Sequence, residues 1–547
     1  MTAPASEHRS VANRLPQSVD ALIVGAGFAG LYMLLRLRRL GMSAAVIEAG
    51  DDVGGTWYWN RYPGARCDIE SLEYQYGFDD DLAREWHWTE RYAAQPEILR
   101  YIQHVADKFE LRDGITFNTR VTSAVFDEQL ARWSITTDQG DQVSARFCIM
   151  ATGCLSSARV PDFKGIESFE GEWYHTGSWP HEGVDFSGKR VAVIGTGSSA
   201  IQSIPQIARQ AKSLTVFQRT ANFSVPAHNG PIDRAEEARM LAKYTDIRRE
   251  AQTTPGGFLQ RLANDKSAID ATEDERQYEY QKRWDVGGFA IGGAFNDLAF
   301  NPASNETAAE FVRSKIREIV KDPATAELLC PRDYPFATKR LCVDIDYFET
   351  FNRPNVSLVD VKHTPIDEIT PHGLRIGDTA YEFDAIVFAT GFDAMTGALL
   401  NVDIRGREGL PLREKWKHGP RTYLGLQIAG FPNLFTVTGP GSPSVLSNMI
   451  VSIEQHVDWI SDCLEYLREH EIQMIEATPE AEDAWVQHVN DVANFTLYPL
   501  ANSWYIGANV PGKPRVFMPY IGGVGVYRER CEQVAASGYE GFSLGSR

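Results

Sequence analysis

The chain has 547 residues, of which 43% are hydrophobic and 23% are charged, and its formal net charge at pH 7 is -19. A chain of this length is too long to fold around a single hydrophobic core, so roughly two to four domains are expected. The composition is that of a folded protein. The acidic charge argues against nucleic acid or an anionic membrane as a partner, but it allows a small ligand held by local positive groups.

The N-terminal region and the cysteines indicate where the protein works. The first twenty residues have no apolar signal core, and no stretch of about 18 uninterrupted apolar residues follows, so we expect a cytoplasmic protein whose residues 1–17 form a flexible arm. The seven cysteines are scattered, with no CxxC pair and no metal-ligand spacing. They predict reduced thiols and no metal site.

A dinucleotide-binding motif follows this arm. A short apolar strand leads into Gly25, Gly27 and Gly30, which form GxGxxG, and a predicted helix and a second strand ending in Glu48 come next. The glycines permit a tight turn and close backbone approach to a pyrophosphate at the helix N-terminus. An acid about 20 positions after the turn accepts hydrogen bonds from a free ribose, so this unit predicts an FAD site.

The motif occurs a second time, with a different ending. Gly195, Gly197 and Ala200 form GxGxxA between an apolar strand and a predicted helix, and Arg219 and Thr220 stand where the first copy has its acid. A cation at this position suits a 2′-phosphate, so the second unit predicts an NADPH site. Arg219 as an ordinary surface cation is the alternative.

Each copy is later followed by an apolar strand that ends in Ala-Thr-Gly, at residues 151–153 and 389–391. The interval from the glycine turn to this tripeptide is longer in the second copy, and helical patterns dominate its additional residues. The clearest pattern has Val312, Ile316 and Ile319 on one stripe, with Asn305 as its expected N-cap.

These repeats predict an α/β fold with two nested Rossmann-like dinucleotide-binding domains. The predicted boundaries are residues 18–155 and 393–547 for the FAD domain, 156–225 and 335–392 for the NADP domain, and 226–334 for a helical insertion in the NADP domain.

Two dinucleotide sites indicate a flavoprotein that also uses a nicotinamide. A disulfide reductase needs a pair of redox cysteines at short spacing, and the seven cysteines of this chain include no such pair. A redox sensor that catalyses no reaction is an alternative that the sequence leaves open. The segment GGTWYWNRYPGARCD, residues 54–68, follows the first unit directly. Its glycines and aromatic residues predict a loop beside the flavin ring, with an ordinary packed aromatic loop as the alternative.

Two segments carry a family resemblance. The pattern Phe169-x-Gly171-xxx-His175-xxx-Trp179-Pro180 resembles the FxGxxxHxxxWP fingerprint of the type I Baeyer–Villiger monooxygenases, and residues 54–68 resemble that family's second signature. The likeness extends from about residue 20 to about residue 530 and is strongest toward the phenylacetone and steroid monooxygenase branch. Flavin-containing and N-hydroxylating monooxygenases, whose fingerprint lacks the terminal Trp-Pro, are the alternative.

The resemblance implies a reaction. NADPH reduces FAD, the reduced flavin adds O2, and the resulting C4a-peroxyflavin inserts one oxygen atom beside a ketone carbonyl to give an ester or lactone. Oxygenation at nitrogen or sulfur, and a non-oxygenating NADPH flavin reductase or redox sensor, are the alternatives. The expected partners are a small ketone and O2, with no nucleic acid and no membrane, and we expect a monomer.

The resemblance also implies individual roles. Arg340 matches the catalytic arginine and Asp68 the carboxylate that positions it, whereas residue type alone leaves Arg340 an equal chance of a surface ion pair with Asp344. Lys339 matches a lysine on the 2′-phosphate, and Trp504 a tryptophan on the nicotinamide ribose. The implied FAD contacts are Gly25, Gly27, Phe28, Gly30, Glu48, Gly55, Thr56, Trp57, Asp68, Tyr74, Val121 and Met449; the NADP contacts are Arg66, Gly195, Thr196, Gly197, Ser198, Ser199, Ala200, Arg219, Thr220, Lys339, Arg340 and Trp504.

Two further segments receive roles. The fingerprint is expected to be a linker between the dinucleotide domains, with Gly171 allowing a tight turn and His175 coupling domain position to catalysis; a structural histidine is the alternative for His175. The substrate pocket is expected to be lined by Ser444, Val445 and Leu446. The following helix carries an apolar stripe from residue 450 to 467 that predicts core packing.

Overall fold

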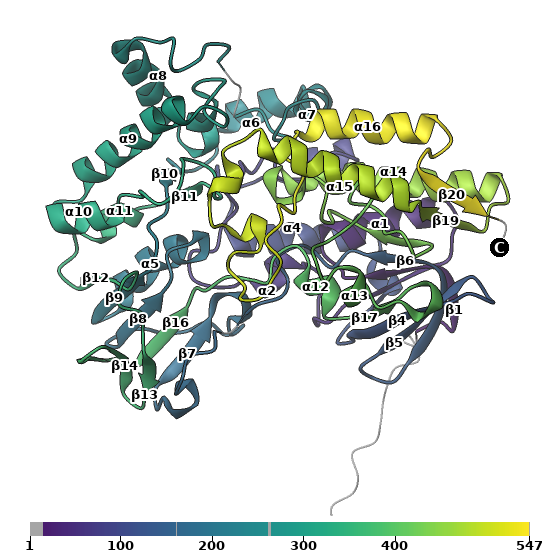
Figure 1. Cartoon of the computed structure of the whole chain (residues 1–547), viewed down its shortest axis with the longest axis horizontal. Coiled ribbons are helices and arrows are strands. Elements are labelled where there is room, and N and C mark those ends of the chain that lie inside the picture. Colours follow the sequence, from purple (N-terminus) through teal and green to yellow (C-terminus); the bar gives the residue numbers. More distant parts are fainter. Residues whose placement is uncertain (1–14, 160, 261–263, 546–547) are drawn as a thin grey trace, which may run out of the picture.

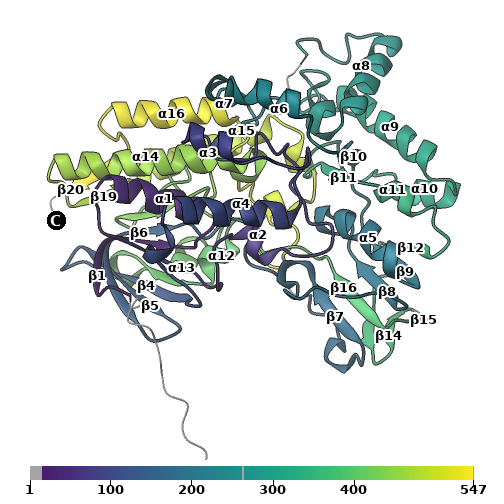
Figure 2. The ribbon, with the colours of Figure 1, turned by 180° about the vertical axis from the view of Figure 1, so that it is seen from behind.

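The computed structural model describes residues 15–159, 161–260 and 264–545, and most of the expected arm, residues 1–14, lies outside this range. Two sheets stand beside each other in Figure 1. A row of helices crosses the top of the sheet at the right, and a second group of helices rises above the sheet at the left. Figure 2 shows the same two groups from behind.

The first sheet contains the first glycine motif. Its strands run in the order β17-β4-β5-β6-β1-β2-β3, with β18 paired to β6, and β1 is parallel to both β2 and β6. The strands are β1 (Ser18–Val24), β2 (Ala44–Ile47), β3 (Ile115–Thr116), β4 (Val121–Asp127), β5 (Arg132–Thr137), β6 (Gln142–Met150), β17 (Asp403–Arg405) and β18 (Leu434–Thr436).

The second sheet contains the second glycine motif and is parallel throughout, in the order β12-β9-β8-β16-β7. Its strands are β7 (Glu172–His175), β8 (Arg190–Ile194), β9 (Ser213–Gln218), β12 (Val356–Asp360) and β16 (Ala385–Phe388). A small antiparallel sheet of β13 (Glu368–Thr370), β14 (Gly373–Ile376) and β15 (Thr379–Glu382) adjoins it in sequence.

The fingerprint segment differs from its expected form as a linker. Four of its residues form β7, which pairs in parallel with β16 at the edge of the second sheet. Gly171 makes no left-handed turn. A Cβ at this position would lie 2.6 Å from the carbonyl oxygen of Asp384. Close packing, and not turn geometry, therefore explains why a glycine stands here.

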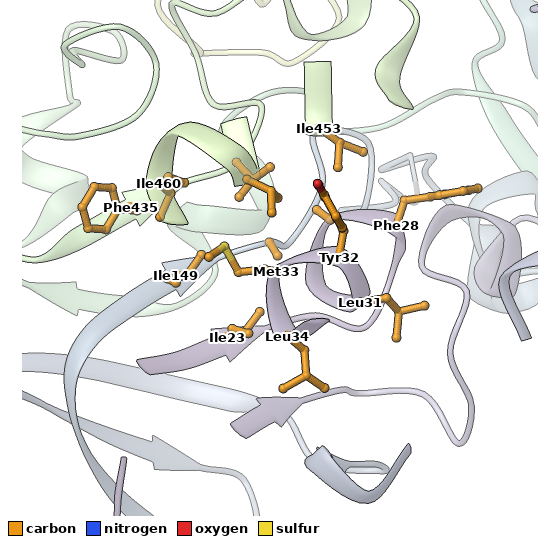
Figure 3. Packing of buried hydrophobic residues seen from close by; sticks show 14 of the residues in the cluster. Ile23, Phe28, Leu31, Tyr32, Met33, Leu34, Ile149, Phe435, Ile453 and Ile460 are labelled. Carbon is orange, nitrogen blue, oxygen red and sulfur yellow. The ribbon is translucent and has the colours of Figure 1, made fainter. Parts of the chain in front are cut away.

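Each glycine turn leads into a helix, α1 (Phe28–Arg39) in the first unit and α5 (Ser198–Gln210) in the second. The long helix α14 (Met449–Glu469) packs on α1, and the stripe that the sequence predicted is buried between them. Figure 3 shows Tyr32 of α1 pointing toward α14, where Ile453 lies, and the Tyr32 hydroxyl donates to Asp458 at 2.7 Å. The side chains of this interface belong to the largest hydrophobic cluster among the described residues.

A helical region lies between β10 (Ser224–Pro226) and β11 (Cys342–Asp344), which pair in parallel. It contains α6 (Arg234–Leu241), α7 (Tyr244–Ala251), α8 (Glu273–Val286), η5 (Gly288–Gly293), α9 (Pro302–Ile319) and α10 (Pro323–Leu329).

The N-cap expected at Asn305 is wrong. Helix α9 begins one turn earlier, where Asn301 accepts from the backbone of Ala303 and Ser304 and Pro302 occupies the first helical position. Asn305 is buried and bridges the carbonyls of Leu298 and Phe336. A proline at the first position costs no hydrogen bond, which is why the helix begins there.

The remaining elements complete the two layers. They are α2 (Thr56–Trp59), α3 (Asp80–Glu85), α4 (Gln95–Lys108), α11 (Tyr347–Thr350), α12 (Gly397–Leu400), α13 (Leu412–Lys415), α15 (Pro479–Asn494), α16 (Val524–Ala536), β19 (Met474–Ala477), β20 (Phe542–Gly545) and the short helices η2 (Arg112–Gly114), η3 (Ile166–Ser168), η4 (Thr176–Ser178), η6 (Arg407–Gly409), η7 (Ser444–Leu446), η8 (Tyr498–Leu500) and η9 (Trp504–Ile506).

None of the helices in the described residues combines the length and the apolar character needed to cross a bilayer. In the same residues, no group of three or more His, Cys, Asp or Glu side chains could hold a metal ion. All seven cysteines are free and buried.

Candidate active site

A cavity of about 940 Å³ connects the two glycine motifs. Gly25 and Gly27, after β1, line one part of it, and Gly195 and Gly197, after β8, line another. Both turns therefore stand at the carboxyl ends of parallel strands, the edge at which such sheets bind ligands. One continuous space is thus bordered by both predicted dinucleotide sites.

The first part of the cavity fits FAD. Gly25 has φ +104°, and a Cβ on it would lie 2.7 Å from the carbonyl oxygen of Ala151. A Cβ on Gly55 would lie 2.9 Å from the Cα of Gly27, so two bare backbones meet where a flat cofactor has to approach. The predicted contacts that line the wall are Gly25, Gly27, Phe28, Glu48, Gly55, Thr56, Trp57, Asp68, Tyr74, Val121 and Met449.

Glu48 is fixed at the cavity wall by two backbone hydrogen bonds. Its carboxylate accepts from the backbone N–H of Ala26 at 2.7 Å and of Gly50 at 2.8 Å, and the side chain is buried at the end of β2. A carboxylate has about four acceptor positions, so two oxygens fixed in this way keep positions free for the hydroxyl groups of a ligand, as the prediction of a ribose contact requires. Gly30 differs from its predicted role, because it lies inside α1, where a Cβ would clash with the carbonyl of Gly25.

The second part of the cavity fits a phosphorylated dinucleotide. Arg219 and Lys339 both line it, and in the described part of the chain neither has an ion-pair partner. Burial and then the charge of Arg219 lower the pKa of Lys339 to about 8. The carboxylate of Asp333 raises the pKa of Lys339 but forms no ion pair with it, so the two cations offer a binding site for an anion such as a 2′-phosphate.

Most predicted NADP contacts lie on the same wall. Gly195 has φ +117°, and a Cβ on it would meet the carbonyl oxygen of Ala389 at 2.5 Å. Ala200 is an exception, since it is buried in α5 behind the turn. The contacts that line the cavity are Arg66, Gly195, Thr196, Gly197, Ser198, Ser199, Arg219, Thr220, Lys339, Arg340 and Trp504.

Arg340 is clamped on three sides. Its Nε and Nη2 donate to the two oxygens of Asp68 at 2.8 and 2.7 Å, its Nη1 donates to the carbonyl of Val445, and its guanidinium lies 5.4 Å from the ring centre of Phe289. Burial favours a lower pKa for Arg340, but the charge and hydrogen bonds of Asp68 outweigh it and raise the pKa. The result is a permanently charged, fixed cation.

The alternative prediction, a surface ion pair between Arg340 and Asp344, is wrong. Asp344 is buried beside β10, where it accepts from the hydroxyl of Ser224 and, at 3.1 Å, from the backbone of Tyr347. Burial raises the pKa of Asp344 to about 7.

A small cavity of about 50 Å³ adjoins Arg340. Its lining includes Val445 and Leu446, two of the residues predicted for a substrate pocket, together with Phe258, Phe289 and Tyr505. Ser444 differs from the prediction: it is fully buried behind this wall, and its hydroxyl donates to the carbonyl of Thr438.

Sequence reasoning missed the aromatic side of this small cavity. Phe258 and Phe289 come from the helical region, where an aromatic residue is most often core, and no spacing relates them to Arg340. The only available signal was the position of Phe289 in a glycine-rich stretch, GGFAIGG.

The fingerprint histidine, His175, is 1% exposed. Its Nδ1 accepts from the backbone N–H of Gly177 at 3.0 Å, so the neutral ring carries its proton on Nε2, which lies 3.2 Å from the hydroxyl of Thr390. Burial lowers the pKa of His175. Trp179 packs on Tyr174 with ring centres 5.4 Å apart, Phe169 packs against the core beneath β16, and Pro180 follows at the end of the segment. Gly177 and Thr390 line the large cavity, so the histidine stands one residue behind its wall.

Known proteins resemble this chain over nearly its whole length. A family model described as pyridine nucleotide-disulphide oxidoreductase matches residues 22–233. A Baeyer–Villiger monooxygenase of Pseudooceanicola batsensis is 44% identical over 525 residues, which cover 95% of each chain. A solved structure of oxidised steroid monooxygenase bound to NADP is 52% identical, with a TM-score of 0.93, covering 97% of this chain and 100% of that one. A structure of OTEMO in complex with FAD and NADP is 42% identical, with a TM-score of 0.93, covering 96% and 99%.

The name of the matching family model refers to disulfide chemistry, which seven free, buried cysteines do not support. The fold and both dinucleotide sites agree with the full-length relatives. Because a relative at 44% identity covers 95% of the chain, this protein belongs to the type I Baeyer–Villiger monooxygenases, FAD- and NADPH-dependent enzymes that insert one oxygen atom of O2 beside a ketone carbonyl to give an ester or lactone.

Proposed function

We propose that Arg340 is the catalytic cation of this oxygen insertion and that Asp68 positions it. The observation that carries the proposal is the bidentate Arg340–Asp68 pair, which stands where the large cavity and the small aromatic cavity share a wall. When bound, FAD reduced by NADPH supplies the activation of O2; the chain supplies the environment in which the ketone is attacked.

Arg340 stabilises negative charge without supplying a proton. Attack on a carbonyl carbon develops charge on the carbonyl oxygen, and a preorganised guanidinium in a site sheltered from water stabilises that charge strongly. Because the pKa of Arg340 is raised, the side chain stays protonated throughout the working pH range. The two hydrogen bonds to Asp68 hold the plane of the guanidinium, so little reorganisation accompanies the reaction.

The proposed site for the ketone is the small cavity together with the adjoining part of the large one, because both are lined by Arg340, Val445 and Ser447. The wall of the small cavity is mainly apolar and aromatic, with Ile69, Phe258, Phe289, Leu446 and Tyr498 around the cationic edge. Such a wall excludes water and binds apolar substituents, while the cation faces the carbonyl oxygen. That the enzyme works as a cytoplasmic monomer stays a prediction from the sequence.

Product analysis tests the proposed function. The purified enzyme, supplied with FAD, NADPH and O2, is expected to convert at least one member of a panel of linear, cyclic, aryl and steroidal ketones to the ester or lactone. An amine and a sulfide of matched size serve as controls for N- and S-oxygenation. Oxidation of the amine or sulfide with no ester from any ketone would contradict the assignment.

The pH dependence of nucleotide binding tests Lys339. A cation whose pKa is about 8 in the free enzyme binds a phosphate only when protonated, so affinity for NADP⁺ is fully present below pH 8 and is lost above it. The dissociation constant should rise by up to about tenfold per pH unit above pH 8. Calorimetric titration from about pH 7 to about pH 9.5 measures it.

Two controls accompany this titration. Lys339→Met should bind NADP⁺ more weakly, with no inflection near pH 8, and NAD⁺, which lacks the 2′-phosphate, should bind wild type with no such dependence. An unchanged inflection in Lys339→Met would assign the titration to another group.

A further inference from the structure

A fully buried histidine of α14 has both ring nitrogens committed. The backbone N–H of Thr438 donates to Nδ1 of His456 at 2.9 Å, and the Tyr527 hydroxyl lies 2.8 Å from Nε2. An amide N–H only donates, so Nδ1 is the acceptor, and the neutral ring carries its proton on Nε2 and donates to Tyr527. Tyr527 in turn donates to the carbonyl of Leu424 at 2.5 Å. Burial lowers the pKa of His456 to about 3, so one tautomer persists at any working pH.

These hydrogen bonds end on strained backbone. Leu424, Thr438 and Ser444 have φ of 58°, 55° and 43°, a region that residues other than glycine seldom adopt. Tyr527 binds the carbonyl of Leu424, His456 binds the amide of Thr438, and the Ser444 hydroxyl donates to the carbonyl of Thr438 at 3.0 Å. Strained conformations persist where surrounding contacts over-determine them, and each of these three has such a contact.

The same set of hydrogen bonds reaches the proposed catalytic cation. Thr438 lines the large cavity, and Ser444, bonded to it, begins η7. The next residue, Val445, presents the carbonyl that accepts from Nη1 of Arg340. A relay of His456, Thr438, Ser444 and Val445 therefore leads from the core of α14 to the guanidinium.

We propose that His456 is a positioning residue for this monooxygenase: through Thr438 and Ser444 it holds the Val445 carbonyl against Arg340. It does so from behind the cavity wall, in the core between α14 and α16. The inference rests on the proposed role of Arg340. Loosening the relay weakens the third contact of the guanidinium, so we expect the Arg340–Asp68 pair to shift relative to the reacting carbonyl, while NADPH, which is proposed to bind at Arg219, still binds.

A matched pair of substitutions tests the histidine. In His456→Asn the amide oxygen reaches the position of Nδ1 and still accepts from Thr438, whereas in His456→Gln the amide group reaches the position of Nε2 and the contact to Thr438 is lost. We expect His456→Asn to keep most of the wild-type ratio of ester or lactone formed to NADPH consumed. In His456→Gln this ratio should fall about tenfold, with an unchanged KM for NADPH. Thermal melting of both variants reports the structural effect separately. Equal product yields in the two folded variants would overturn the proposal.

A second pair of substitutions tests the relay without changing His456. Ser444→Ala removes the bond to the carbonyl of Thr438, and Ser442→Ala removes a buried hydroxyl bond of the same loop, to the carbonyl of Gly439 at 2.7 Å. Only Ser444→Ala should lower product per NADPH. In an Arg340→Ala background it should have no further effect, because both changes act on one interaction.

The outcomes separate the two claims. A wild-type product yield in Arg340→Ala alone would overturn the proposed role of Arg340. A loss in Arg340→Ala together with equal yields in Ser444→Ala and Ser442→Ala would overturn the relay and leave the role of Arg340 standing.

Discussion

Arg340→Ala is expected to lower ketone oxygenation by at least about 10²–10³-fold, the loss typical when one preorganised oxyanion donor is removed. The variant should keep its FAD and still bind NADPH, because the glycine turns and the cations at Arg219 and Lys339 are untouched. The measurement is ester or lactone formed per NADPH consumed, with a ketone that wild type accepts. NADPH consumption alone is ambiguous, since Arg340 is also a predicted NADP contact and its loss is expected to slow flavin reduction as well.

Three controls make this result specific. Arg340→Lys should not recover wild-type yield, because a point-charge ammonium cannot reproduce the planar fork that Asp68 holds. Added guanidinium ion should restore part of the product yield in Arg340→Ala and none in Arg340→Lys, where the side chain fills the space. Arg209→Ala, an exposed arginine of α5 paired with Asp346, changes the net charge equally and should behave as wild type. A wild-type yield in Arg340→Ala would show that the charge is stabilised elsewhere.

Arg219→Ala is expected to raise the KM for NADPH by roughly ten- to a hundredfold and to leave the KM for NADH nearly unchanged. The lost interaction is a charge-assisted contact to the 2′-phosphate, worth about 1.5–3 kcal/mol, and NADH has no such phosphate. The preference for NADPH over NADH should therefore be lower in Arg219→Ala than in wild type by the same factor. Steady-state kinetics with both nucleotides, at fixed ketone and O2, give the two constants.

The comparison between nucleotides is the decisive part. Arg209→Ala again serves as the charge-matched control, because Arg209 is exposed and pairs with Asp346 at the surface. Equal penalties for NADPH and NADH in Arg219→Ala would mean that the arginine supports the fold of the site and does not bind the 2′-phosphate.

The sequence alone predicted the fold class, the family and both cofactors, and the comparisons confirm them. The physical reason is that the constraints are local. Gly25 and Gly195 adopt left-handed backbone, and each stands against the alanine carbonyl of an Ala-Thr-Gly that directly follows a strand. Such requirements act within one turn or one strand, so they leave a readable spacing in the chain.

Only the tertiary structure decided which side chains share the site. Arg340 meets Asp68 across 272 positions and Val445 across 105, and Phe289 arrives from the helical region. The same limit explains two corrected expectations. The fingerprint forms β7 because β16, far along the chain, offers it a parallel edge, and Asn305 is drawn into the core because its side chain hydrogen-bonds the backbone of Phe336. Residue types determined which chemistry the chain could perform, whereas packing between distant segments determined which of those groups meet, because contacts of long sequence separation have no period that a single sequence displays.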